Sequence, residues 1–206
     1  MNLPNKLTVF RIFITIFIII ILLFPFHAIG ISSIKLFINE SIVVSLKYII
    51  AGVLFIIGCL TDFVDGYIAR KYNMVTELGK MLDAIADKIL VNSVLIILAA
   101  QGIIHPLIPV IIVSRDTIVD VIKMIVGNKK GAVAAIKSGK IKTTFMMVGL
   151  SLTLFNNLPF ELWNLKISSL FLIIATVLSI YSGIEYYKQN KLYILSDTSK
   201  KLPNKG

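Results

Sequence analysis

The sequence contains few charged residues, and acidic residues are the scarcest of them. Of the 206 residues, 16% are charged and 57% are hydrophobic, and only 11 are Asp or Glu. Soluble domains carry about 25% charged and about 45–50% apolar residues. The composition therefore excludes an ordinary soluble domain and is typical of an integral membrane protein.

Cysteine is nearly absent as well. Cys59 is the only cysteine of the chain, and it lies within an apolar stretch. A single cysteine excludes any disulfide framework within the chain. We interpret Cys59 as a small buried side chain.

Long uncharged runs are what the sequence has in abundance. Four of them contain no Asp, Glu, Lys or Arg: Ile12–Ile34, Ile89–Ser114, Thr143–Phe160 and Ile167–Ile184. About 18–20 apolar residues in a helix cross the ~30 Å hydrocarbon core of a bilayer. The second run is long enough to require a turn inside it.

The runs and the Gly and Pro residues between them predict six transmembrane helices. We expect these spans over residues 8–24, 42–69, 78–100, 107–123, 143–156 and 166–187. The expected fold is an all-α six-helix membrane bundle. Residues 1–188 form one transmembrane domain in this prediction, and 189–206 form a polar cytoplasmic tail.

Positive charge is distributed asymmetrically around these spans. The formal net charge is +10, and of the 21 Lys and Arg residues all but Lys35, Lys47 and Lys166 fall on one side. Short cytoplasmic loops carry the excess of Lys and Arg. Both termini are therefore expected in the cytoplasm, with the chain in the cell membrane. Lysines that flank apolar runs indicate a membrane surface and anionic substrates rather than nucleic acid.

Four aspartates gather where an apolar chain should have none. Asp62 and Asp65 are three residues apart near the cytoplasmic end of the second span, and Asp83 and Asp87 are four apart near that end of the third. Each pair shares one helix face. Because the two spans are consecutive and antiparallel, we expect the two pairs to face each other.

Facing carboxylates near hydrocarbon require a cation. One Asp at the centre of a membrane helix costs about 2.5–3.5 kcal/mol on insertion scales. Oxygen-rich ligands suit Mg²⁺ or Mn²⁺, and four carboxylates are enough for two ions. The competing interpretation is that the aspartates pair with Arg70, Lys80 or Lys88 at the membrane surface.

Small residues accompany the aspartates. Gly66 and Ala69 follow the first pair, and Gly79 precedes the second. Small side chains allow a helix or a ligand to approach the backbone closely. Gly66 and Gly79 are candidates for a cavity wall, and Arg70 is a candidate partner for phosphate oxygens.

The complete pattern is Asp62-x-x-Asp65-Gly66-x-x-Ala69-Arg70, eight residues, then Gly79-x-x-x-Asp83-x-x-x-Asp87. It resembles the signature of the CDP-alcohol phosphatidyltransferase family at all eight fixed positions. The segments 2–11, 139–143 and 182–186 are similar to bacterial members that use glycerol 3-phosphate. One departure is Arg115-Asp116, where Arg-Glu is more usual.

The resemblance implies a six-helix membrane enzyme, usually a homodimer, with a polar cavity open to the cytosol. It implies transfer of a phosphatidyl group from CDP-diacylglycerol to sn-glycerol 3-phosphate, among membrane lipids. Asp62, Asp65 and Asp83 would hold the metals, and Asp87 would complete the metal site and act as general base. The donor would meet Asp62, Arg70 and the three small residues Gly66, Ala69 and Gly79.

A doubly charged acceptor phosphate needs cations that the aspartate cluster lacks. Arg115, Lys137, Lys140 and Lys142 emerge on the same side as the aspartates and are the candidates. The alternative for the lysines is that they only follow the positive-inside rule and touch lipid head groups.

Two other functions stay open at this point. The first is the same chemistry with another acceptor, such as inositol phosphate, serine or a lipid alcohol. The second is a non-enzymatic cation-binding membrane protein or a transporter. A transporter should carry polar residues across the whole bilayer depth, whereas here they gather on the cytoplasmic side.

Overall fold

A computed structural model of the chain describes residues 3–26, 35–38, 42–72, 76–131 and 136–195. Six long helices follow one another in this part of the chain: α1 (Leu3–Leu23), α2 (Leu46–Lys71), α3 (Glu77–Ala100), α4 (Leu107–Lys130), α5 (Lys137–Leu154) and α6 (Ile167–Leu195). Strands β1 (Lys35–Ile38) and β2 (Ile42–Ser45) pair antiparallel between α1 and α2. The predicted order of six helices is therefore present.

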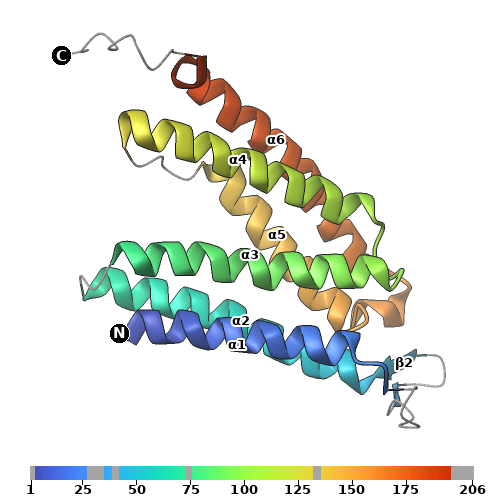
Figure 1. The fold of residues 1–206 in the computed structure, drawn as a ribbon. Coiled ribbons are helices and arrows are strands. Elements are labelled where there is room, and N and C mark those ends of the chain that lie inside the picture. The colour runs from blue at the N-terminus through green and yellow to red at the C-terminus, as the bar shows by residue number, and fades with distance from the viewer. Residues whose placement is uncertain (1–2, 27–34, 39–41, 73–75, 132–135, 196–206) are drawn as a thin grey trace.

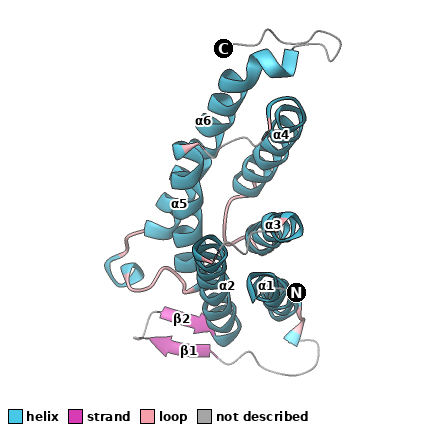
Figure 2. Ribbon diagram, turned by 90° about the vertical axis from the view of Figure 1, so that its left-hand side faces the viewer, coloured by secondary structure: helices cyan, strands magenta, loops and turns pink. Residues whose placement is uncertain are grey.

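The helices form two groups of three. Helix α1 packs against α2 and α3, and α6 packs against α4 and α5. Figure 1 shows α1, α2 and α3 running side by side, with the second group inclined above them. Figure 2 shows α1, α2 and α3 nearly along their axes, with α5 and α6 seen from the side. The start of α1 and the end of α6 lie at the same end of the bundle (Figure 1).

An apolar core joins the helices away from that end. Ile18, Phe55 and Leu95 are fully buried in the first group, and Leu150 and Leu172 are almost fully buried between α5 and α6. All five belong to one continuous cluster of buried apolar residues. This core sets the positions of the polar ends of α1 to α6.

The outer faces of the bundle are also apolar. Phe13, Phe63 and Val177 are 65%, 71% and 60% exposed. Exposed apolar surface of this extent is characteristic of contact with lipid. Among the described residues, three helices have the length and composition to cross a membrane: Pro4–Leu23, Leu46–Ala69 and Ile167–Leu195. The chain is therefore a membrane protein, and helices α3, α4 and α5 carry most of the charged side chains described below.

Several helix boundaries differ from the predicted spans. Helix α2 begins at Leu46 rather than at Ile42, because Ile42–Ser45 pairs with Lys35–Ile38 as a strand. Ile42, Val43 and Val44 are β-branched and favour extended backbone. At the other end of the bundle α4 continues to Lys130 and α5 begins at Lys137, whereas the predicted spans end at 123 and begin at 143.

Candidate active site

The four aspartates lie together in the structure. Asp62 and Asp65 project from the last turns of α2, and Asp83 and Asp87 from the first turns of α3. Carboxylate oxygens of Asp62, Asp65 and Asp83 lie within 4.8 Å of one another. Helix α3 begins just before them because Thr76 caps it, accepting a hydrogen bond from the backbone N–H of Gly79 at 3.0 Å.

A cation already stands among these carboxylates, and it is Arg11 of α1. Its Nη1 lies 2.8 Å from Asp62, 3.0 Å from Asp83 and 3.0 Å from Asp87, and its Nη2 lies 2.5 Å from Asp65. The Arg11 side chain is fully buried, whereas the Asp83 side chain is 43% exposed. The guanidinium therefore enters the cluster from inside the bundle and leaves its other side open.

The sequence interpretation missed Arg11 as a site residue. It counted Arg11 only among the cytoplasmic positive charges. A signal was nevertheless present, because Asn5, Thr8, Arg11 and Thr15 are spaced at helical intervals along one face of a largely apolar helix. All four are buried, and Thr8 donates a hydrogen bond to Asp65 at 3.3 Å. A polar stripe on a membrane helix indicates a buried polar partner.

The cluster fits a divalent metal ion by its chemistry. Every candidate ligand atom is a carboxylate oxygen, which suits hard cations such as Mg²⁺ and Mn²⁺. The oxygens converge closely enough to share an ion. One guanidinium compensates only part of the negative charge of four carboxylates. The remaining negative charge favours the binding of further cations.

The residues assigned to the donor lie around this cluster. Gly66 and Ala69 are half-buried on α2, one to two turns from Asp62. A Cβ atom at Gly79 would lie 2.6 Å from Oδ1 of Asn5, so any side chain there would collide with α1. The side chain of Arg70 lies outside the described residues, as does that of Lys80.

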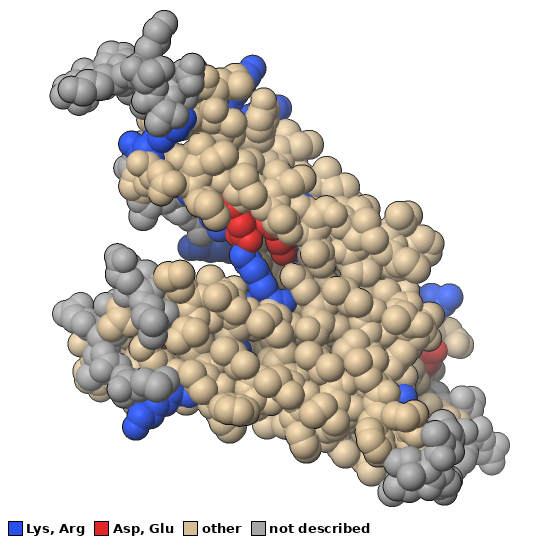
Figure 3. Space-filling view, viewed as in Figure 1, with Lys and Arg blue, Asp and Glu red and all other residues tan. Residues whose placement is uncertain are grey.

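A cavity of about 400 Å³ lies between the two groups of helices. Figure 3 shows the molecule hollowed there, with blue and red side chains at the opening and mostly tan surface elsewhere. Asp87 is part of its wall, together with residues of α4, α5 and α6. Asp87 therefore belongs both to the aspartate cluster, where the guanidinium of Arg11 contacts it, and to the wall of the cavity.

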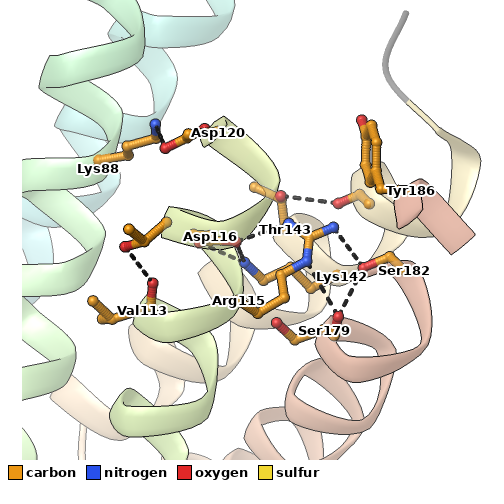
Figure 4. Close-up of polar contacts among 12 residues, drawn as sticks. Lys88, Val113, Arg115, Asp116, Asp120, Lys142, Thr143, Ser179, Ser182 and Tyr186 are labelled. Atoms are coloured by element: carbon orange, nitrogen blue, oxygen red, sulfur yellow. Dashed lines mark hydrogen bonds and ion pairs between the residues drawn. The ribbon is translucent and has the colours of Figure 1, made fainter. Parts of the chain in front are cut away.

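Two of the predicted acceptor cations share one carboxylate in this cavity wall. Arg115 Nη1 donates to Asp116 at 2.8 Å, and Lys142 Nζ donates to both Asp116 oxygens at 2.8 Å. Arg115 also donates through Nη2 to Ser182 Oγ and through Nε to the carbonyl of Ser179 (Figure 4). The departure noted in the sequence, Asp116, is thus the residue that holds these two cations.

The other two predicted cations differ from each other. Lys140 lines the cavity, and both it and Lys137 are exposed on the first turn of α5. Lys137 is absent from the described cavity wall. The structure therefore brings Arg115, Lys140 and Lys142 together and places Lys137 outside this group.

The cavity wall also contains Lys88, Asp120 and Lys123, of which the sequence analysis named only Lys88. Lys88 pairs with Asp120 across α3 and α4 (Figure 4), and Lys123 lies 5.3 Å from the ring centre of Tyr186. Lys88 was expected to be a possible partner for the aspartate cluster. It reaches a different carboxylate, because Asp120 of the facing helix α4 lies within its range.

The structure thus places clustered carboxylates at one wall of a polar cavity and cations at another. The chain belongs to the CDP-alcohol phosphatidyltransferase family, whose model matches residues 1–181. The family predicted from the aspartate signature is thereby confirmed.

Relatives within the family carry a more particular name, CDP-diacylglycerol–glycerol-3-phosphate 3-phosphatidyltransferase. The protein of that name from Bacillus subtilis is 40% identical over 189 residues, which cover 92% of this chain and 95% of the relative. The Rickettsia typhi protein is 36% identical over 193 residues, covering 93% and 98%. The Mycoplasma pneumoniae protein is 38% identical over 155 residues, covering 75% and 68%.

Proposed function

We propose that this chain transfers the phosphatidyl group of CDP-diacylglycerol to sn-glycerol 3-phosphate, giving phosphatidylglycerophosphate and CMP. The observation that carries the proposal is the position of Asp87, which lies in the aspartate cluster and also lines the cavity with the cations. The names of relatives matched over most of their length support the same donor and acceptor.

The aspartates would hold two Mg²⁺ or Mn²⁺ ions, because their carboxylate oxygens are negatively charged and are the ligands that hard cations prefer. Asp62, Asp65 and Asp83 offer converging oxygens, and Asp87 lies beside them. Such ions, when bound, neutralise charge on the donor diphosphate and on the leaving CMP. We assign Asp62, Gly66, Ala69, Arg70 and Gly79 to donor binding.

Asp87 is our candidate for the general base. The acceptor hydroxyl oxygen forms a bond to the phosphorus of the phosphatidyl group, and the bond from that phosphorus to the oxygen of CMP breaks. The hydroxyl proton passes to a carboxylate oxygen of Asp87, and CMP leaves with the bonding electron pair. A positioned base of this kind contributes about 10²–10⁴-fold to the rate.

Arg115, Lys140 and Lys142 are assigned to the phosphate of the acceptor, and Lys137 stays a weaker candidate for the same role. Arg115 and Lys142 keep unused N–H groups beyond those that contact Asp116, Ser179 and Ser182. A guanidinium and an ammonium beside one carboxylate retain net positive charge, which suits a phosphate dianion.

The membrane arrangement is a further part of the proposal. All six helices would cross the cell membrane, with both termini in the cytoplasm, 1–188 as the catalytic domain and 189–206 as a polar tail. The chain would act as a homodimer. Single cysteines at the exposed positions Asn128 and Lys166 in a Cys59→Ala background should react from opposite sides of sealed cells. Reaction of both from outside would overturn this orientation.

The decisive experiment measures CMP release by the purified protein with CDP-diacylglycerol and Mn²⁺. Glycerol 3-phosphate should support turnover, and inositol phosphate, serine and a lipid alcohol should support far less. Preference for one of the other acceptors would keep the chemistry and reject the assigned acceptor. Absence of CMP release with every acceptor would reject the transferase.

A further inference from the structure

Arg11 occupies an unusual position for a charged residue. Its side chain is fully buried near the start of α1, and its guanidinium contacts carboxylates from both α2 and α3. Its Nε atom is buried and has no hydrogen-bond partner among the described residues. The contacts made by its two terminal nitrogens therefore hold it in place.

These contacts use the oxygens that a metal ion would need. Nη1 lies within 3.0 Å of Asp62, Asp83 and Asp87, so one nitrogen stands at the point where three carboxylates converge. Nη2 takes the fourth carboxylate, that of Asp65. A hard cation bound among these carboxylates would occupy the same small volume that the guanidinium of Arg11 now fills.

The guanidinium also stabilises the cluster in its present form. Four carboxylates brought together without a cation repel one another, and removal of one partner from a buried ion pair is strongly destabilising. Arg11 is the described cation that contacts all four. Without it, and without metal, the facing ends of α2 and α3 would carry uncompensated negative charge.

We propose that Arg11 is a resident counter-cation of the site, which a divalent metal ion must displace from the carboxylates. This inference rests on the proposed function, which places the metal on the same aspartates. Arg11 then has two opposing effects. It stabilises the metal-free protein, and it lowers the affinity of the site for metal because its contacts are lost when the ion binds.

The test uses the purified full-length protein in detergent and two measurements. Electron paramagnetic resonance of free Mn²⁺ gives the Kd of the site, and thermal unfolding in EDTA and in Mn²⁺ gives the metal dependence of stability. Arg11→Gln should bind Mn²⁺ about tenfold more tightly, the equivalent of one lost charge-assisted contact. Its Tm in EDTA should fall, and Mn²⁺ should raise that Tm by more than in the wild type.

Lys6→Gln is the matched control. Lys6 lies on the same helix and is exposed, so its replacement removes the same charge without touching the cluster. Its Mn²⁺ affinity and its Tm in EDTA should equal those of the wild type. Arg11→Lys keeps the charge but loses the planar fork, so we expect it to lie between the wild type and Arg11→Gln in both measurements.

Two results would overturn the inference, and they are distinguishable. Unchanged or weaker Mn²⁺ binding by Arg11→Gln would reject displacement, while leaving the metal site intact. If Arg11→Gln does not fold, Arg11→Lys decides by the same criterion. If the wild type binds Mn²⁺ with the same affinity after Asp83→Asn and Asp87→Asn together, the proposed metal site itself is wrong.

Discussion

Two polar clusters of the molecule are built with opposite charge. In the aspartate cluster, one cation, Arg11, stands among four carboxylates. In the basic cluster, which we define as Arg115, Asp116 and Lys142, one carboxylate stands between two cations. The first lies between α1, α2 and α3, and the second between α4, α5 and α6.

The two clusters differ in the sign of their residual charge. Four carboxylates against one guanidinium leave three negative charges, and two cations against one carboxylate leave one positive charge. In both clusters the minority residue holds the others in place without neutralising them. The residual charges have the signs expected for metal ions and for an acceptor phosphate, and Asp87 lies where the cavity connects the two.

The largest expected loss of activity comes from substitutions in the aspartate cluster. Asp87→Asn should lower kcat by about 10²–10⁴-fold, because the amide cannot accept the hydroxyl proton. Asn at Asp62, Asp65 or Asp83 should also remove nearly all CMP release, and EDTA should abolish it until Mg²⁺ or Mn²⁺ is restored. Glu161→Gln, which alters a carboxylate far from the cluster, is the control. Near-normal turnover in two or more of the four variants would contradict the metal site.

Substitutions in the basic cluster should weaken the binding of one substrate, glycerol 3-phosphate. Arg115→Ala and Lys142→Ala should each raise the KM for glycerol 3-phosphate by about 10–100-fold, the usual value of a charge-assisted hydrogen bond. The KM for CDP-diacylglycerol should change little, as expected when only acceptor binding is lost. Steady-state kinetics with each substrate varied in turn provides the measurement, and an equal rise for both would place the acceptor elsewhere.

Substitution of Asp116 should lower the thermal stability of the protein more than its catalytic rate. The Lys142 side chain is 3% exposed, and its ammonium donates hydrogen bonds to both carboxylate oxygens of Asp116. Asp116→Asn leaves this ammonium without an anionic partner, so Tm should fall by several degrees. Asp116→Glu keeps the charge and should recover most of the loss. Equal Tm values for the Asn and Glu variants would show that the carboxylate does not hold the cluster.

The smallest effect distinguishes two exposed lysines of α5. Lys140 lines the cavity and Lys137 does not. Lys140→Ala should raise the KM for glycerol 3-phosphate several-fold, since an exposed charge contact contributes up to about 1 kcal/mol. Lys137→Ala should change it less than twofold. A reversed order would show that the acceptor approaches from outside the described cavity.

Much of the aspartate cluster was predictable because it is local. Asp62 with Asp65, and Asp83 with Asp87, share helix faces through their spacing alone. The short connection between α2 and α3 then brings the two faces together. The predicted start of α2 at Ile42 was wrong for a local reason too, because β-branched residues there favoured the strand paired with Lys35–Ile38.

The partners of these residues were not predictable in the same way. Arg11 is 72 residues from Asp83, and Asp116 is 26 residues from Lys142. No spacing rule links positions on separate helices at such distances. The sequence grouped Lys137, Lys140 and Lys142 as equivalent cations, whereas the structure exposes the first and buries the last.

The sequence by itself determined the membrane class, the order of six helices and the four carboxylates. Those features follow from composition and from helical periodicity, which the chain carries at short range. The tertiary structure alone decided that Arg11 enters the carboxylates and that Asp116 holds Arg115 and Lys142. The physical reason is that packing between helices selects which buried charges meet, and a buried charge accepts the partner that lies within reach.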